Sequence, residues 1–160
     1  MQRVSIIGLG LIGASIGLGL KRWATDNGRR EPVLEISGFD VSLDVQNYAK
    51  KLGAVDRTEW NLPNAIESAD FIIIATPVGA VREVLQSIAE HGRDGVVVTD
   101  TGSTKADVLS WAAEILPPTI HFVGGHPMAG KTQSVEGAEA DLFKQATWAV
   151  CPTVTASEEA

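Results

Sequence analysis

Three glycines near the start of the chain have the spacing of a phosphate-binding loop. Gly8, Gly10 and Gly13 form a G-x-G-x-x-G pattern between a predicted strand at 3–7 and a predicted helix from about 11 to 24. In such a loop the first glycine permits a tight turn and the second lets the backbone approach a pyrophosphate, while the third allows close packing of helix and strand. The sequence therefore predicts a dinucleotide site at these glycines.

The backbone N–H groups at the start of the predicted helix form the second part of this site. A helix N-terminus carries unpaired N–H groups and a partial positive charge, both of which favour a bound phosphate. We expect Leu11 and Ile12 to supply these groups to the cofactor. The alternative is a glycine-rich turn before an ordinary helix, but the strand–helix–strand context favours the dinucleotide.

Asp40 ends a second predicted strand at 33–39 and is the acidic residue expected in a dinucleotide-binding unit. Its carboxylate can accept hydrogen bonds from both adenosine ribose hydroxyls and would repel the extra phosphate of NADP. Val41 and Ser42 offer no guanidinium to that phosphate, so the sequence predicts NAD. A polar insertion at 26–32 explains why Asp40 lies more than the usual spacing of about 20 residues from the glycine loop. The alternative is an aspartate that caps the next helix.

Thr76 and Pro77 follow an apolar stretch at 71–75 that predicts a strand buried on both faces. Ligands of open parallel sheets bind at the carboxyl edge, where this strand ends. Thr76 is therefore a candidate cofactor contact, and a turn-forming role is an equal alternative. Pro77 is suited to begin the following helix, and beside Thr76 it is a second candidate cofactor contact.

Two further segments carry side chains that could handle a proton. His126 lies in Gly-Gly-His-Pro-Met-Ala-Gly at 124–130, between the end of a short predicted strand and a glycine-flanked loop. Oxidation of an alcohol needs a base for the hydroxyl proton as hydride leaves, and imidazole has a suitable pKa near neutrality. Ser103 lies in Asp-Thr-Gly-Ser-Thr-Lys at 100–105, where it could contact a substrate or cap a helix. On residue type alone, His126 could also be an ordinary solvated histidine.

The elements that must position these residues alternate between short apolar stretches and longer amphipathic ones. Strands are expected at 3–7, 33–39, 71–75, 96–99, 121–123 and 148–150, with at most a short one at 54–56. Helices are expected at about 11–24, 42–51, around 81–88 and at 104–116. This alternation predicts an α/β fold of the Rossmann type, doubly wound around a mostly parallel sheet. Residues 1–152 would form one dinucleotide-binding domain, and 153–160 a linker or chain end.

Local signals mark some of the helix ends. Ser42 has the residue type of an N-cap, and Gly53 is suited to end the same helix in the left-handed conformation. Thr104 and Asp107 have the spacing of a capping box, with aspartate in place of the usual glutamate.

Composition narrows the class of protein. The 160 residues are 44% hydrophobic with a net charge of −7 and no basic stripe, so a nucleic-acid partner is not expected. The single cysteine, Cys151, excludes an internal disulfide and suits a reducing cytoplasm. The uncharged stretch at 4–20 is shorter than the roughly 20 residues of a membrane span, so no membrane is expected. The histidines lack the spacing of metal ligands, so no metal is expected.

Taken together, these segments resemble the prephenate/arogenate dehydrogenase family, whose members form the aromatic ring of tyrosine. The histidine segment and the Gly-Ser-Thr-Lys segment are the most specific parts of the resemblance. The matching pieces run in the family's order at 8–13, 38–40, 75–78, 100–105, 124–130, Leu142-Phe143 and Trp148. The resemblance implies a Rossmann-type NAD-binding domain that would be followed by a separate helical domain.

The resemblance also implies a reaction and roles for two side chains. His126 would hydrogen-bond the substrate's ring hydroxyl and help to remove its proton. Hydride would pass from the ring carbon to NAD, and loss of CO₂ would make the ring aromatic. Ser103 would orient His126 and touch the same hydroxyl. The products would be 4-hydroxyphenylpyruvate from prephenate or tyrosine from arogenate.

The sequence departs from the family in two respects. Lys-Thr-Gln at 131–133 occupies a stretch in which many members carry a glutamate. The family's helical domain, which dimerises and supplies a substrate-binding arginine, is absent from these 160 residues. We therefore expect this chain to bind NAD but to turn over poorly alone, and the full-length protein to be a homodimer.

Two other functions are compatible with the glycine loop and Asp40. One is another two-domain NAD(P)-dependent dehydrogenase, of the β-hydroxyacid or imine-reducing kind, which would lack the His-Pro-Met-Ala-Gly segment. The other is a non-catalytic NAD-sensing module, which would need neither His126 nor Ser103.

Overall fold

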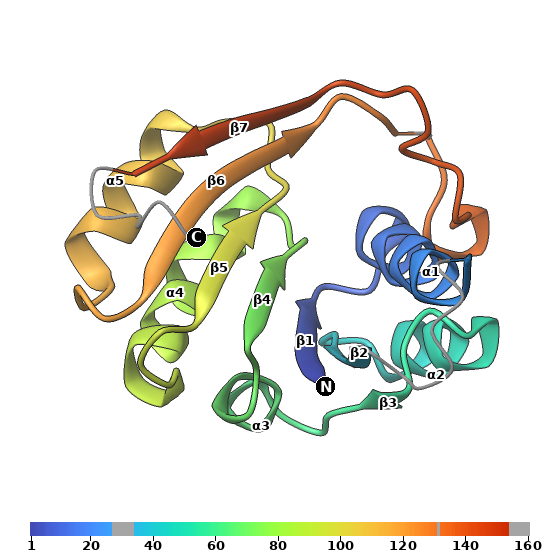
Figure 1. The fold of residues 1–160 in the computed structure, drawn as a ribbon, viewed down its shortest axis with the longest axis horizontal. Helices are drawn as coiled ribbons and strands as arrows, with labels where there is room; N and C mark the ends of the chain where they lie inside the picture. Colours follow the sequence, from blue (N-terminus) through green and yellow to red (C-terminus); the bar gives the residue numbers. More distant parts are fainter. Residues whose placement is uncertain (27–33, 131, 154–160) are drawn as a thin grey trace.

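A single seven-stranded sheet organises the chain (Figure 1). The structure is a computed structural model that describes residues 1–26, 34–130 and 132–153. Its strands are β1 (Gln2–Ile7), β2 (Leu34–Phe39), β3 (Arg57–Thr58), β4 (Phe71–Ile74), β5 (Val97–Asp100), β6 (His121–Pro127) and β7 (Trp148–Pro152). Their spatial order is β3-β2-β1-β4-β5-β6-β7, and every neighbouring pair is parallel except β6 and β7. The predicted doubly wound, mostly parallel fold is confirmed.

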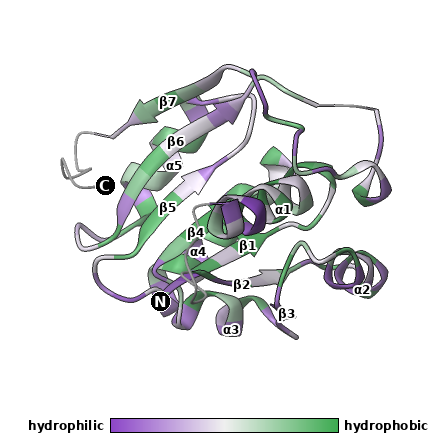
Figure 2. Ribbon diagram, turned by 45° about the vertical axis from the view of Figure 1, so that its right-hand side comes forward, coloured by the Kyte–Doolittle hydropathy of each residue, from purple (hydrophilic) through white to green (hydrophobic). Residues whose placement is uncertain are grey.

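Helices cover both faces of this sheet. They are α1 (Leu11–Asp26), α2 (Leu43–Leu52), α3 (Leu62–Glu67), α4 (Val78–His91) and α5 (Ala106–Ile115), with a 3-10 turn at Val135–Gly137. One hydrophobic core joins the sheet to α1 and α2, and a second core joins it to α3, α4 and α5. The apolar strands in the middle of these layers are visible in Figure 2.

The sequence of β4 shows why a central strand is apolar at consecutive positions. Side chains alternate between the two faces of a strand. Ile72 and Ile74 lie in the core with α3, α4 and α5, while Ile73 lies in the core with α1 and α2. A strand covered on both faces therefore cannot show the apolar–polar alternation of a half-exposed strand.

The ends of α2 follow the local signals in the sequence. The Ser42 side chain accepts a hydrogen bond from the N–H of Val45, with 3.4 Å between the atoms. Gly53 adopts the left-handed conformation at φ 81°, and its N–H donates to the carbonyl oxygen of Lys50. Both predicted ends of this helix are confirmed.

Other boundaries differ from the sequence-based predictions. The third strand forms at Arg57–Thr58 rather than at 54–56, because the ladder with β2 forms only at Ser37↔Arg57 and Gly38↔Thr58. Helix α3 was not predicted, although Asn61 caps it by accepting a hydrogen bond from the N–H of Asn64 at 2.8 Å. The predicted polar insertion at 26–32 lies, apart from Asp26, outside the described residues.

The start of α5 also differs. The helix begins at Ala106 rather than at Thr104, and no side-chain capping bond forms at its start, so the predicted capping box with Asp107 is wrong. The residue before the helix, Lys105, instead directs its side chain to Asp100 at the end of β5. The helix thus begins two residues after its predicted start.

The largest difference from the predicted strands is at β6, which continues to Pro127 instead of ending at 123. Strand β7 pairs with it in antiparallel register from Val123↔Pro152 to Pro127↔Trp148. The expectation that His126 lies beyond a strand end is therefore wrong, because β7 extends the ladder through this residue. His126 pairs with Ala149 inside the sheet.

Between β6 and β7 the chain leaves the sheet and packs against α1. We call residues 128–147 the excursion; Figure 1 shows its orange turn beside α1. Val135 is buried in the core of α1 and α2. The N–H of Glu139 donates to the Ser15 hydroxyl at 3.1 Å, and Arg22 pairs with Asp141. The excursion thus connects the edge strand β7 to a helix on the other half of the sheet.

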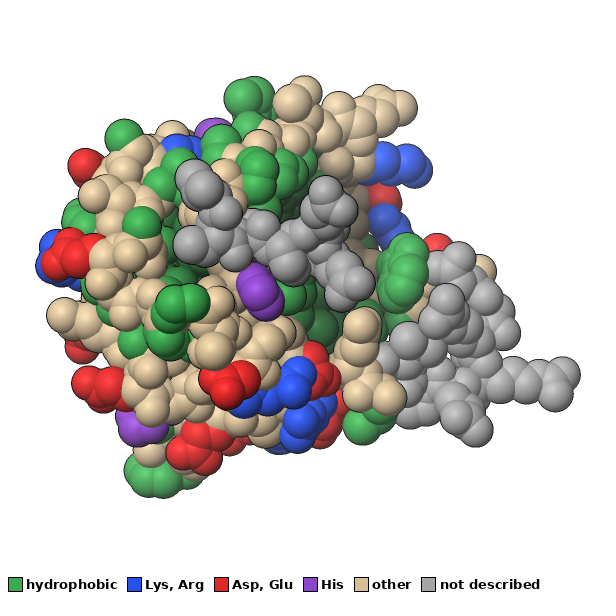
Figure 3. Space-filling view, turned by 60° about the vertical axis from the view of Figure 1, so that its left-hand side comes forward, with side chains coloured by type: hydrophobic (Ala, Val, Ile, Leu, Met, Phe, Trp, Pro, Cys, Tyr) green, Lys and Arg blue, Asp and Glu red, His purple; other side chains and the backbone are tan. Residues whose placement is uncertain are grey.

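The surface carries charges of both signs. On the face drawn in Figure 3, acidic and basic side chains lie next to one another. Within residues 1–26, 34–130 and 132–153, no helix is long and apolar enough to cross a membrane.

Candidate active site

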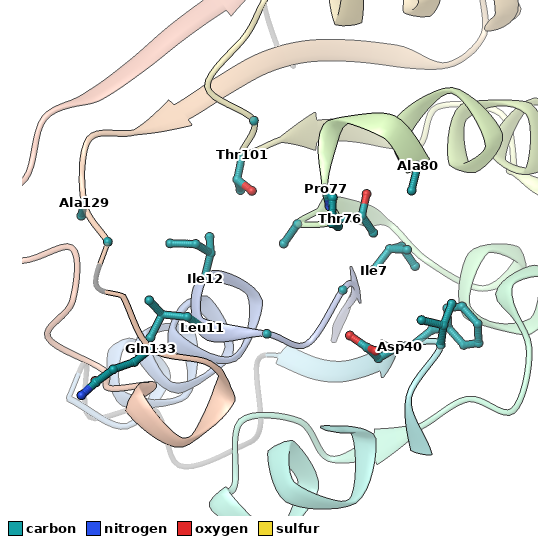
Figure 4. Close-up of a pocket in the computed structure, with 17 residues that line it drawn as sticks. Ile7, Leu11, Ile12, Asp40, Thr76, Pro77, Ala80, Thr101, Ala129 and Gln133 are labelled. Carbon is teal, nitrogen blue, oxygen red and sulfur yellow. The ribbon is translucent and has the colours of Figure 1, made fainter. Parts of the chain in front are cut away.

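A cleft of about 710 Å³ opens at the carboxyl edge of the sheet. It lies among the ends of β1, β2, β4 and β5 and the first residues of the excursion (Figure 4). The lining residues are Ile7, Gly8, Gly10, Leu11, Ile12, Phe39, Asp40, Val41, Ala75, Thr76, Pro77, Ala80, Thr101, Gly102, Ala129, Gly130 and Gln133. Five sequence segments that were predicted separately therefore meet at one site.

The three glycines of the loop have different surroundings. Gly8 has φ 94°, and a Cβ there would lie 2.6 Å from the carbonyl oxygen of Ala75. A Cβ at Gly13 would lie 1.9 Å from the carbonyl oxygen of Gly8. A Cβ at Gly10 would meet no atom within 4 Å. Gly8 and Gly13 are thus required by the turn and the helix packing, while Gly10 leaves open space on the cleft side.

The start of α1 is suited to an anion. Leu11 and Ile12 form its first turn and line the cleft, and this turn contains no acidic side chain. The partial positive charge of the helix N-terminus therefore meets no carboxylate from its own helix. Open space at Gly10 beside free helix N–H groups fits the pyrophosphate of a dinucleotide.

Asp40 lies at the β2 end of the cleft (Figure 4). Its Oδ2 accepts a hydrogen bond from the N–H of Leu9 at 2.8 Å, and its Oδ1 accepts one from the N–H of Ser42 at 2.9 Å. The Gln46 side chain donates to the Asp40 carbonyl oxygen at 2.6 Å. Ser42, rather than Asp40, caps α2. The carboxylate is thus fixed at the cleft with lone pairs left for a ligand.

Thr76 and Pro77 lie across the cleft from α1, at the end of β4. The Thr76 hydroxyl is buried and has no hydrogen-bond partner among the described residues. A buried hydroxyl without a partner is costly, so a polar group of a bound ligand would satisfy it. Pro77 precedes α4 at its N-cap position and makes no side-chain capping bond. Thr76 and Pro77 thus line the cleft in which the sequence predicts them to contact the cofactor.

His126 and Ser103 lie near the cleft but not in its lining. The His126 ring is half-buried, and its Nδ1 is buried without a hydrogen-bond partner among the described residues. Ser103 is exposed in the turn between β5 and α5, and no hydrogen bond joins it to His126 within the described part of the chain. Their neighbours Gly102, Ala129 and Gly130 do line the cleft.

An ion pair next to these two residues was not predicted. Asp100 is fully buried at the end of β5, and it pairs with Lys105. The same carboxylate accepts hydrogen bonds from the N–H of Gly102 at 2.9 Å and from the N–H of Gly125 at 3.2 Å. The only sequence signal was an aspartate at the end of an otherwise apolar strand.

Some lining residues also escaped prediction. Thr101 and Gly102 follow β5 directly and could have been inferred from their place at the carboxyl edge. Gln133 lines the cleft from the excursion, and no local pattern indicates that this segment packs near α1. Among the described residues, no group of three or more His, Cys, Asp or Glu side chains is arranged to hold a metal ion.

Comparisons with known proteins agree with this geometry. Residues 23–160 match the family model described as prephenate dehydrogenase, nucleotide-binding domain. The prephenate dehydrogenase of Lactococcus lactis is 40% identical over 149 residues, which are 91% of this chain and 40% of that protein. The chain therefore spans about 40% of the length of this relative.

Solved structures give the same result. Prephenate dehydrogenase from A. aeolicus, in complex with hydroxyphenyl propionate and NAD⁺, has a TM-score of 0.86 and 28% identity, covering 99% of this chain and 53% of that one. Arogenate dehydrogenase from Synechocystis has the same TM-score and identity, covering 99% and 52%. A 3-hydroxyisobutyrate dehydrogenase from Mycobacterium tuberculosis, at 20% identity and a TM-score of 0.71, shares the fold alone.

The family model covers most of the chain, and its nucleotide-binding description fits a sheet-edge cleft built around the glycine loop. The chain therefore belongs to the prephenate dehydrogenase family, in the part of it that forms the nucleotide-binding domain.

Proposed function

We propose that this chain binds NAD and supplies the catalytic histidine of an enzyme that oxidatively decarboxylates prephenate or arogenate. The observation that carries this proposal is that two segments share one cleft. The glycine loop lines it with Gly8 and Gly10, and the segment that contains His126 lines it with Ala129 and Gly130. A bound dinucleotide would thus lie next to the candidate base.

The cofactor would extend along the cleft. Its pyrophosphate would lie at Gly10 and the N–H groups of Leu11 and Ile12, and its adenosine ribose would bind the Asp40 carboxylate. The Thr76 hydroxyl and Pro77 would contact its other half. Bound NAD supplies a hydride acceptor, and the protein contributes binding, orientation and proton handling.

His126 would take the proton of the substrate's ring hydroxyl. Because Nδ1 is buried, Nε2 is the nitrogen that would face the substrate. The ring C–H bond breaks with transfer of hydride, and the O–H bond breaks with transfer of the proton to Nε2. The bond to the ring carboxylate then breaks to release CO₂, and its electron pair completes the aromatic ring. The phenol oxygen recovers a proton, so atoms and electrons balance.

Ser103 would orient His126 and contact the same hydroxyl. It is the side chain of the turn between β5 and α5 that the family resemblance assigns to this role. The exposed hydroxyl of Ser103 is available to a substrate that approaches the edge of the cleft. A neutral hydroxyl can donate to one partner and accept from another, as this position requires.

The net charge of −7 supports a small-molecule substrate and no nucleic-acid partner. The single cysteine supports a cytoplasmic location. The family resemblance supports a homodimer of the full-length protein. The 160-residue chain alone would bind NAD and turn over poorly.

The experiment is a substrate and cofactor panel with the full-length gene product that contains this chain. Prephenate and arogenate are each offered with NAD and with NADP, and reduced cofactor is followed by its absorbance. We expect NAD reduction with one or both substrates, with equal amounts of CO₂ and aromatic product. The absence of reduced cofactor with both substrates would overturn the proposal.

A further inference from the structure

The Asp100–Lys105 ion pair lies between the end of β5 and the start of α5, next to the segments that carry Ser103 and His126. The Asp100 side chain is fully buried and that of Lys105 is 16% exposed. Removing two charges from water offsets much of their attraction, so such a pair adds little stability beyond a well-packed apolar pair. Its presence next to His126 and Ser103 therefore calls for another explanation.

The Asp100 carboxylate joins the two segments that carry the candidate catalytic residues. Its Oδ2 accepts from the N–H of Gly102, the residue before Ser103, at 2.9 Å. Its Oδ1 accepts from the N–H of Gly125, the residue before His126, at 3.2 Å. One buried group thus sets the position of both backbones relative to each other.

The Lys105 side chain runs along the face of β6 that carries His126. A Cβ at Gly124 would lie 3.3 Å from Lys105 Cδ, so the lysine stem passes directly over this glycine. The pairing of β6 with β7 is regular from Val123 to Pro127, so side chains alternate and residues 124 and 126 share one face. A side chain at 124 would displace the lysine.

We propose that Lys105 and Asp100 act together as a positioning pair that holds the turn carrying Ser103 against the strand carrying His126. This inference rests on the proposed function, because it concerns the same reaction. Lys105 neutralises Asp100, whose two oxygens accept hydrogen bonds from the N–H groups of Gly102 and Gly125. Without the ammonium, a lone buried charge remains, and the carboxylate must move toward water. This movement releases one of the two backbones.

The principal test is Lys105→Met in the full-length gene product, with Glu114→Gln as the matched control. Glu114 lies on α5, the helix that follows Lys105, and forms an exposed ion pair with Arg82; neither residue lines the cleft. Because misplacement of catalytic groups by about 1 Å can cost 10²-fold, we expect kcat of Lys105→Met to fall by about that factor. Lys105→Arg should recover part of kcat. Unchanged kcat in Lys105→Met would overturn the inference.

A second readout separates this inference from the proposed function. In protein labelled with ¹⁵N-histidine, the signals of His126 are identified by their loss in His126→Asn. We expect Lys105→Met to shift the His126 ring signals and leave those of His91 in place. If the unsubstituted protein turns over neither substrate, the proposed function fails. If the His126 ring signals do not shift in Lys105→Met, the positioning role fails, whatever the result with the substrates.

A third variant applies if Lys105→Met does not fold. The double variant Asp100→Asn with Lys105→Met removes both charges and leaves no lone charge in the interior. Its amide has one acceptor oxygen in place of two, so it cannot hold both Gly102 and Gly125 in the same way. We expect a folded protein whose kcat stays low, and a return to full kcat would contradict the positioning role.

Discussion

The carboxylate of Asp40 accepts a hydrogen bond from the backbone N–H of Leu9, with 2.8 Å between the two atoms. The residue that follows β2 is thereby tied to the middle of the glycine loop. The two parts of the cofactor site, one for the pyrophosphate and one for the ribose, form a single rigid unit. A change at Asp40 should therefore affect affinity as well as the choice between NAD and NADP.

We expect Asp40→Asn to weaken NAD binding by about tenfold, since a hydrogen bond to a charged group contributes about 1.5–3 kcal/mol. NADP binding should weaken less or improve, because the repulsion of its additional phosphate is lost. Calorimetric titration with both cofactors measures the ratio of the two Kd values. Asp44→Asn, at an exposed position on the neighbouring helix α2, is the control. An unchanged ratio would show that Asp40 does not read the ribose.

His126→Asn should remove proton transfer but leave the cofactor site intact. General-base catalysis contributes about 10²–10⁴-fold, so we expect kcat of the full-length protein to fall within this range. The Kd for NAD should change less than about twofold, because His126 is outside the lining of the cleft. His91→Asn, at the end of α4, is the control and should keep full turnover. Full turnover by His126→Asn would contradict the assignment of His126 as the general base.

Alanine substitutions at Gly10 and Gly17 should show that the first glycine is needed for NAD binding and the second for stability. A Cβ at Gly10 meets no atom within 4 Å, whereas a Cβ at Gly17 would lie 2.2 Å from the carbonyl oxygen of Ala54. We expect Gly10→Ala to keep its Tm and lose at least about tenfold in NAD affinity, since the methyl group occupies the path of the pyrophosphate.

Gly17→Ala should show the opposite behaviour. Overpacking of this kind costs about 1–3 kcal/mol, so the Tm should fall while the folded fraction keeps its NAD affinity. Thermal unfolding with and without NAD measures both effects. Loss of NAD affinity in Gly17→Ala, or loss of Tm in Gly10→Ala, would contradict this division between the two glycines.

Asp56 should make stability depend on acid pH. Burial opposes its ionisation, but hydrogen bonds from Lys21 and from the N–H of Ile36, together with the charges of Lys21 and Arg57, hold the Asp56 pKa below its ordinary value. A lowered pKa in the folded state gives stability that is present above the unfolded value of about 3.9 and is lost as pH falls through the folded pKa.

We therefore expect Asp56→Asn to be less stable than the unsubstituted chain at neutral pH, and this difference to shrink below about pH 4. Chemical unfolding across the acid range measures it. Asp44→Asn, at an exposed position, should show no such convergence. A constant difference between Asp56→Asn and the unsubstituted chain over the whole pH range would contradict the role of Asp56.

The parts of the fold that the sequence predicts depend on neighbours along the chain. The glycine loop, the Ser42 cap, the Gly53 stop and the buried strand β4 are set by residues within a few positions, and each agrees with the structure. The family resemblance is confirmed by the family model and by a relative of 40% identity.

The parts that escaped prediction depend on distant partners. His126 lies inside a strand because β7, more than twenty residues later, extends the ladder to Pro127. Gln133 reaches the cleft because the excursion packs on α1. No local pattern contains this information, since each contact closes a loop through the sheet.

The excursion at 128–147 couples the edge of the sheet to the nucleotide cleft. Strand β7 pairs only with β6 in the described sheet, and the residues that join these two strands rest on Ser15 and Arg22 of α1. Near the start of the excursion, Ala129 and Gly130 line the cleft beside the glycine loop. A nucleotide bound in the cleft would hold the segment that leads into β7, and amide hydrogen exchange in β7 should therefore slow when the nucleotide binds.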